Sequence, residues 1–465
     1  MLTLCRYSRR EGHLVIAPEQ SRAGSISAAI LLGLSLLLGG GGTPAPLPEL
    51  VLQVASALVL GCWIYREPDV LQRVPSAVWW IVGLITALHL MQLVPLPPAL
   101  WQALPGRSAA IASLTLVQGE DSWRPLSLSP LRTVASLLCA ISALGVLLIT
   151  SILHSAARWR LLQTIALIGL ATLVVGVGQI KGEAGNPLRF FNPQQVWLTG
   201  FQANRNSTAD IILIAMLAGA ALLWRLRQRQ RQPALLVPSA LLLFDLTMIA
   251  ALYLTGSRTG LILLAPVLLV QFLIVQTGRR TQWRGLLPWA AGVMALAVLA
   301  ANFLRGNRTI VAVIDRFTLE GEFRPELWRD SVFALGQYWP AGSGQGTFVP
   351  VMIAAERLEV VDPTLPNRAH NDFLELAIEG GLPGVLILLV IGAILLHAAL
   401  RALRSEPEER RVQTLFAVAA LFLLMLHSLV DYPLRSMALA AVSAAAAGIL
   451  FRARPKRTGS EESQV

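Results

Sequence analysis

Charged residues are scarce in this sequence. Asp, Glu, Lys and Arg make up 14% of its 465 residues, whereas hydrophobic residues make up 55%. A soluble domain carries about 25% charged residues, so this composition excludes a soluble protein of this length. The apolar residues instead come in repeated runs of about 20, which is the length of a membrane-spanning helix. The composition therefore predicts a polytopic membrane protein.

Cysteines and familiar metal motifs are scarce as well. The three cysteines, Cys5, Cys62 and Cys139, fall in the N-terminal tail or in apolar runs, so they suggest no disulfide framework and no metal cluster. The sequence has no HExxH motif, no carboxylate triad and no Asp-x-Asp sugar-nucleotide motif. A metal-dependent mechanism has no support, and we expect no cofactor.

The apolar runs predict an all-α fold with about twelve transmembrane helices, because backbone in lipid must satisfy its own hydrogen bonds. A transmembrane barrel is excluded, since its strands would alternate in polarity. The first run follows a long polar segment without an evident cleavage site, so we interpret it as a retained helix. The predicted spans are residues 24–42, 47–64, 77–96, 131–153, 159–180, 207–224, 236–255, 259–277, 284–304, 373–400, 411–429 and 434–452.

The basic residues predict the orientation of these spans. With the N-terminus in the cytoplasm, cytoplasmic segments hold 23 of the 38 Lys and Arg residues, and short external loops hold 8. Positive residues are enriched on the cytoplasmic side of membrane proteins. We therefore expect a membrane domain at 23–453 between two cytoplasmic tails, 1–22 and 454–465. A nucleic-acid partner is not expected, because no basic soluble domain exists to bind one.

One external segment, residues 305–371, is much longer than a connection between two helices needs to be. The segment has residues at helical spacing, most of them apolar, which predict a first helix there: Leu327, Trp328, Ser331, Val332 and Leu335. A second short helix is expected at 349–358. We therefore predict that this segment folds into a lobe that lies on the external face of the membrane.

His370 and Asn371 open the tenth predicted span at the water-facing mouth of a membrane helix. A neutral imidazole there can accept a proton from a hydroxyl nucleophile. A lone histidine in a loop is more often a surface residue, but this position favours a catalytic base. A rival pair is His427 with Asp431, one helical turn apart on one face. For that pair a structural hydrogen bond at the helix end is the favoured interpretation.

Arginines on the same external side are candidates for binding an anion. Arg258 lies in a minimal turn between two spans, and its planar guanidinium suits phosphate oxygens. The alternative is an arginine that snorkels and anchors the helix ends. Arg324 and Arg329 in the lobe are also explained by a solvated helix face. The glycine series Gly342, Gly344 and Gly346 lacks the ending of a nucleotide P-loop, so we predict a tight turn packed on the lobe.

The order of these motifs resembles the bacterial O-antigen ligase and O-antigen polymerase superfamily over about residues 190–440. Its specific part is His370-Asn371 followed after nine residues by Gly381-x-x-Gly384. The remaining motifs, singly weak, follow in the family's order: Asn204-x-Asn206, Ser257-Arg258-x-Gly260, Arg324-x-x-x-Trp328, Gly342-x-Gly-x-Gly-x-Phe348 and His427-x-x-x-Asp431.

The resemblance implies an inverting, metal-independent glycosyltransferase with a GT-C-like membrane fold in the bacterial inner membrane and a periplasmic active site. Its donor would be a glycan on undecaprenyl diphosphate. His370 would act as the general base, and Arg258 and Arg324 would bind the donor diphosphate. The resemblance also points to supporting residues in the other motifs: Asn204, Asn206, Arg329, Asn371, His427 and Asp431.

Three functions stay open at this stage. The first is a ligase that joins the glycan to lipid A-core, and the second is a polymerase that extends a second lipid-linked glycan for O-antigen or exopolysaccharide. Both use the same donor, so the shared motifs do not separate them. The third is a polysaccharide transporter or flippase. Against a transporter, the spans lack charged residues at mid-membrane depth and show no inverted repeat.

Overall fold

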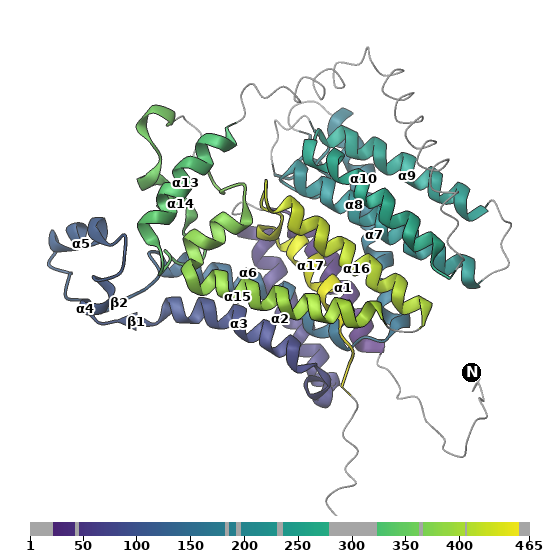
Figure 1. The fold of residues 1–465 in the computed structure, drawn as a ribbon, viewed down its shortest axis with the longest axis horizontal. Helices are drawn as coiled ribbons and strands as arrows, with labels where there is room; N and C mark the ends of the chain where they lie inside the picture. Colours follow the sequence, from purple (N-terminus) through teal and green to yellow (C-terminus); the bar gives the residue numbers. More distant parts are fainter. Residues whose placement is uncertain are drawn as a thin grey trace, which may run out of the picture.

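The computed structural model describes residues 22–41, 46–181, 186–191, 197–229, 236–278, 323–361, 366–404 and 407–454. Helices account for most of this part of the chain (Figure 1). The one sheet found in these ranges pairs two-residue strands, β1 (Pro95–Leu96) and β2 (Arg124–Pro125), in antiparallel fashion. The predicted all-α polytopic fold is confirmed.

Among the described residues, eight helices are long and apolar enough to cross a membrane, and three apolar helices are shorter. Together they coincide with eleven of the predicted spans, and the span at 284–304 lies outside the described residues. The twelfth span therefore stays a prediction. The eleven helices are α1 (Arg22–Leu38), α2 (Pro46–Arg66), α3 (Ser76–Leu93), α6 (Pro130–Ile152), α7 (Ser155–Lys181), α8 (Arg205–Arg229), α9 (Leu236–Thr255), α10 (Arg258–Gln276), α15 (Asp372–Leu403), α16 (Glu408–His427) and α17 (Met437–Leu450).

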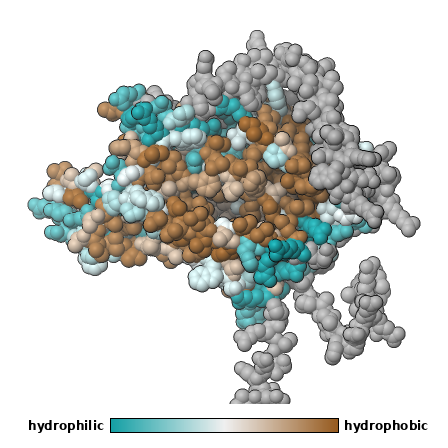
Figure 2. Space-filling view, in the orientation of Figure 1, coloured by the Kyte–Doolittle hydropathy of each residue, from teal (hydrophilic) through white to brown (hydrophobic). Residues whose placement is uncertain are grey.

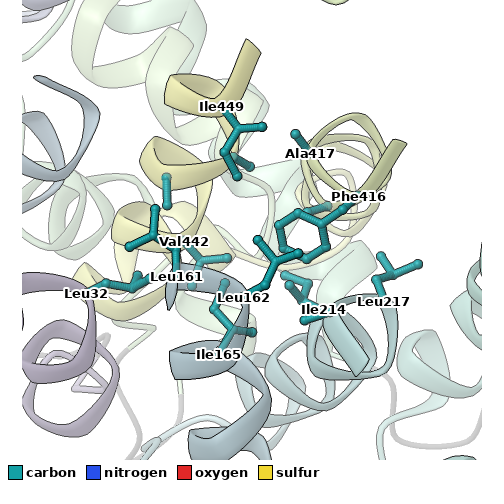
Figure 3. Close-up of a cluster of buried hydrophobic side chains, with 14 of the residues drawn as sticks. Leu32, Leu161, Leu162, Ile165, Ile214, Leu217, Phe416, Ala417, Val442 and Ile449 are labelled. Carbon is teal, nitrogen blue, oxygen red and sulfur yellow. The ribbon is translucent and has the colours of Figure 1, made fainter. Parts of the chain in front are cut away.

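The hydrophobic core lies where α1, α7, α8, α16 and α17 meet (Figure 3). α8 is buried along most of its length and forms the centre of the bundle. Small residues let helices approach closely, as where Gly169 of α7 contacts Ala215 of α8. The larger side chains that fill the centre are Leu32, Leu161, Leu162, Ile165, Ile214, Leu217, Phe416, Val442 and Ile449.

Arginines gather at one end of the bundle, where α17 ends. Arg158 donates from Nη1 to Ile449 O and from Nη2 to Phe451 O, both at 2.7 Å. Arg410 donates to Leu450 O at 3.1 Å. The last carbonyls of a helix have no partner within it and carry partial negative charge, so guanidinium groups satisfy and stabilise this end. These arginines belong to the segments predicted to be cytoplasmic, and the structure groups them on one side.

The predicted lobe lies at the opposite end of the bundle (Figure 1). Its described part holds α13 (Arg324–Tyr338), α14 (Phe348–Ala355) and the short helix η3 (Leu358–Val360), which confirms both predicted helices. Val332 is exposed, however, and Ala334 is buried in its place. The buried face of α13 is made of Leu327, Asp330, Ser331 and Ala334, so the helix is rotated relative to the prediction. Further elements at this end are α4 (Pro98–Trp101), α5 (Ser108–Thr115) and η4 (Pro433–Arg435), and η1 (Pro68–Arg73) follows α2.

The surface of the bundle is largely hydrophobic, and hydrophilic residues concentrate toward its two ends (Figure 2). This distribution suits helices that face lipid along their sides and water at their ends. The exposed apolar side chains of the outer helices include Leu58, Trp80, Leu243, Ile262 and Leu389. The chain is a multi-pass membrane protein.

α15 is interrupted near its start. Gly381 has φ 57° and ψ −155°, which is not helical, so residues 372–380 form a short helix ahead of the long one. A loop of the lobe fills the break, because Leu382 N donates to Pro340 O at 2.9 Å and Ser343 N donates to Ile378 O at 3.0 Å. The glycines at 342, 344 and 346 have positive φ within this loop. The predicted tight turn is confirmed, but its glycines contact α15 and the segment around the start of α6 instead of the lobe.

Replacing Gly381 with Ala should destabilise the protein by about 2–4 kcal/mol, since only glycine adopts this conformation readily. An added Cβ would also lie 2.3 Å from Pro340 O. The thermal midpoint of the detergent-solubilised protein measures the effect. Gly392→Ala is the matched control, because Gly392 lies inside the helical part of α15 with nothing within 4 Å. The control should be neutral or slightly stabilising, and equal midpoints for both variants would contradict the prediction.

Candidate active site

His370 lies in a strained loop between the lobe and α15. Its φ of 48° places it in the left-handed region, which is uncommon for residues other than glycine. Two contacts hold the preceding residue, because Trp328 Nε1 donates to Ala369 O at 2.9 Å and Ala369 N donates to Glu375 Oε2 at 3.0 Å. Strained residues persist when their surroundings over-determine them, and they cluster at functional sites. His370 is therefore held firmly in place.

The partner of His370 is Asp431. His370 Nδ1 lies 2.9 Å from Asp431 Oδ1, and we call these two residues the dyad. Asp431 is almost fully buried and accepts further hydrogen bonds from the amide groups of Asn204 and Asn206. These two asparagines stand immediately before and inside the start of α8. The dyad therefore joins the loop ahead of α15, the turn after α16 and the N-terminal end of α8.

Asp431 is an anion at neutral pH. Burial raises the pKa of its carboxyl group, but the hydrogen bond from His370 and the positive charges of His370, His427 and Arg324 outweigh burial and hold this pKa below its usual value. A carboxylate only accepts hydrogen bonds, so the proton of a neutral His370 sits on Nδ1. The lone pair on Nε2 is then available to accept a proton.

The proposed pairing of His427 with Asp431 is wrong as the main contact of either residue. His427 Nδ1 lies 2.6 Å from Asp210 Oδ1, whereas His427 Nε2 and Asp431 Oδ2 are 4.0 Å apart. The two residues do stay one helical turn apart, because Asp431 N donates to His427 O at 2.9 Å. Each side chain nevertheless has a nearer partner from another element, His370 for Asp431 and Asp210 for His427.

The predicted arginines differ in their surroundings. Arg324 begins α13 close enough for its charge to act on both Asp431 and His427. Arg329 is exposed on the same helix, which fits the solvated helix face. Arg258 begins α10, and Ser257 caps this helix by accepting from Gly260 N at 3.1 Å. Gly260 packs against Ala209, the neighbour of Asp210, so Arg258 lies at the same end of the bundle as the dyad.

Comparison with protein families matches residues 243–389 to the O-antigen ligase family. The match covers less than half of the chain, and it makes this segment similar to an O-antigen ligase domain. It includes Arg258, Arg324 and His370, and it stops before Asp431. The resemblance inferred from the motifs is confirmed, and the match supports a membrane glycan enzyme of the ligase or polymerase type. A search of the curated proteins returns no match to the chain.

Aromatic rings lie against the dyad and were not predicted. The rings of Phe323 and Tyr432 meet the imidazole of His370 edge-on, with centroids 5.2 and 4.8 Å away. Arg205 lies over the ring of Trp197, 5.3 Å from its centroid, and Gly256 packs against the same ring. Arg205 stands between the two asparagines of a recognised motif, so its neighbours in the sequence were the signal that pointed to it.

A buried ionic cluster beside the site was also missed. Arg435 of η4 lies 3.7 Å from Asp372, 3.3 Å from Glu375 and 2.7 Å from Glu379. Burial lowers the pKa of Arg435, but the three carboxylates outweigh burial and raise it. Arg368 also binds Glu375, at 2.9 Å. The three acidic residues recur at helical spacing at the start of α15, which was the available signal.

This cluster ties the lobe to the membrane helices. Glu379 Oε1 accepts from Phe348 N at 3.0 Å, at the start of α14, while its other oxygen binds Arg435. Asn371 caps α15 by accepting from Leu374 N at 3.0 Å, and its amide group donates to Leu429 O at 3.0 Å. Asn371 therefore helps to fix the position of His370, and neither of these two hydrogen bonds goes to the dyad.

One argument against a transporter does not hold. Asp245 lies midway along α9 and is buried, so the spans do contain an acidic residue at mid-membrane depth. It accepts from Gln271 Nε2 at 3.0 Å, and the same amide group donates to Met216 O at 2.8 Å. A single acidic residue in an apolar run was overlooked, although intramembrane acids merit attention. Here it links α8, α9 and α10.

Proposed function

We propose that this protein transfers a glycan from undecaprenyl diphosphate to a hydroxyl group of lipid A-core at the periplasmic face of the inner membrane. The observation that carries the proposal is the dyad, which lies at one end of a membrane bundle in a chain that is similar to an O-antigen ligase over residues 243–389. The predicted cytoplasmic arginines gather at the opposite end. This arrangement agrees with a periplasmic site and cytoplasmic termini.

In the proposed reaction, Nε2 of His370 accepts the proton of the acceptor hydroxyl as the oxygen attacks the anomeric carbon of the donor. The bond between that carbon and the diphosphate oxygen breaks, and undecaprenyl diphosphate leaves with the bonding electrons. Attack opposite the leaving group inverts the anomeric configuration. Asp431 stabilises the imidazolium that forms, and general base catalysis of this kind contributes about 10²–10⁴-fold. The diphosphate linkage already activates the sugar, so no nucleotide is needed.

Fixed cations would stabilise the leaving group, whose negative charge grows as the bond breaks. Arg258 stands at the N-terminus of α10, where the helix dipole adds a favourable field for an anion. Arg324 begins α13, and its positive charge helps to lower the pKa of Asp431. Groups of this kind that are already in place provide a large part of catalysis, because they need no reorganisation during the reaction.

Arg258→Ala should lower the transfer rate by about 10²-fold, since it removes one charge that stabilises the leaving group. Arg258→Lys should recover part of the rate, because it keeps the charge without the planar fork. The measurement is transfer from lipid-linked donor by purified protein. Arg329→Ala is the matched control, an exposed arginine of the lobe that should change little. A mild effect of Arg258→Ala would contradict diphosphate binding and would favour the alternative, in which Arg258 anchors the helix ends at the membrane surface.

A polymerase uses the same donor chemistry, so the dyad fits that function equally well. The two differ in the acceptor, and the glycan of a deletion strain separates them. Long chains that remain on the carrier lipid would show that a ligase was lost. Single repeats, on the carrier or on lipid A-core, would show that a polymerase was lost and would overturn the ligase proposal.

A further inference from the structure

A second pair of a histidine and a carboxylate lies directly behind the dyad. His427 ends α16 and Asp210 lies in the first turns of α8, and their contact of 2.6 Å is almost wholly buried, with side chains 1% and 0% exposed. His427 Nε2 faces Asp431 at 4.0 Å. His370, Asp431, His427 and Asp210 therefore form a row in which basic and acidic groups alternate.

The charges in this row constrain one another. Two buried carboxylates close together are costly unless a cation compensates them. His427 is the group that stands between both, and Nε2 makes no hydrogen bond within the described residues. The other groups that face this row are Arg324 from α13, His370 from the loop ahead of α15, and the amides of Asn204 and Asn206 at the start of α8.

We propose that His427, protonated and held by Asp210, is a positioning residue that fixes the charge next to Asp431 and thereby the basicity of His370. This inference rests on the proposed function, because it assigns His370 as the base. With an imidazolium on one side, Asp431 attracts the proton of His370 less strongly.

The test is the pH dependence of transfer. In Asp210→Asn the shape is kept, but His427 loses its nearest counter-ion, which disfavours its protonated form. Asp431 then holds the proton on His370 more tightly, so the acidic limb of kcat/KM should move up by about one pH unit. At alkaline pH the rate should stay within a few-fold of the wild type. His427→Gln should produce the same shift, and the double variant should add nothing further.

Asp245→Asn is the matched control. Asp245 is a buried acidic residue of α9 that accepts a hydrogen bond from the amide group of Gln271 in α10, and it has no part in the row. This variant should leave the acidic limb in place. Asp210→Glu keeps the charge and should restore the wild-type limb, which guards against loss of folding as the cause. An equal loss of rate at every pH, with the limb unmoved, would reduce the pair to a structural contact.

The outcomes also separate this inference from the proposed function. If His370→Ala retains transfer activity, the proposed function fails and the row has no catalytic base to serve. If His370→Ala is inactive while Asp210→Asn and His427→Gln both show an unmoved acidic limb, the proposed function stands and the role of His427 is overturned. A shift in the opposite direction would also overturn it.

Discussion

Replacing His370 with Ala is expected to lower glycan transfer by about 10²–10⁴-fold, the share that a general base contributes. The loss has a direct cause, because Asp431 and its two asparagines remain but no imidazole is left to accept the hydroxyl proton. In cells that display a surface glycan, the glycan should disappear while the amount of membrane protein stays normal. Purified protein with a lipid-linked donor gives the rate directly.

The matched control for this substitution is His397→Ala. His397 lies on the same helix, α15, and is exposed on its membrane-spanning part, far along the chain from the loop of His370. The control should retain activity and glycan display. Unchanged glycan display in His370→Ala, at a normal protein level, would remove His370 from the reaction.

Asp431→Asn should cost about 10²–10⁴-fold, although the side chain keeps its size. A neutral amide does not stabilise an imidazolium, and its NH₂ group can turn toward Nδ1 and force the proton onto the nitrogen that must stay free. Loss of the orienting carboxylate in other histidine-carboxylate systems has effects of this order. The readout is kcat, with KM for the donor changing much less, because Asp431 does not bind the diphosphate.

The control for this second substitution is Asp121→Asn, an exposed acidic residue in the segment between α5 and β2. It should behave as the wild type. A loss confined to KM would contradict the role of Asp431 in holding the base.

The lowered pKa of Asp431 adds a pH dependence of stability, because the stabilising charge is present at neutral pH and is lost as the pH falls through its folded-state pKa.

The membrane helices were predictable because lipid imposes a simple rule on the chain. Backbone groups must be bonded within a helix, so an apolar run of sufficient length predicts both the element and its bounds. The position of His370 at a helix mouth follows from the same rule. The helix α13 was recognised from the spacing of its apolar residues, but its rotation was not, and Val332 is exposed.

The contacts of the site were much less predictable, because they join elements far apart in the sequence. Asp431 was assigned to His427 from their helical spacing, whereas its carboxylate lies closer to His370, which is 61 residues away in the sequence. Asp210 and Asp245 are single acidic residues in apolar runs, and nothing local shows what they face. Arg435 became notable only when η4 placed it among three carboxylates of α15.

The break at Gly381 separates the short helix that follows His370 from the helix that spans the bilayer. Residues 372–380 are bonded to the lobe and to η4. The long part of α15 instead exposes apolar side chains such as Leu389, which suit contact with lipid. Changes in bilayer thickness can thus move the long segment without tilting His370.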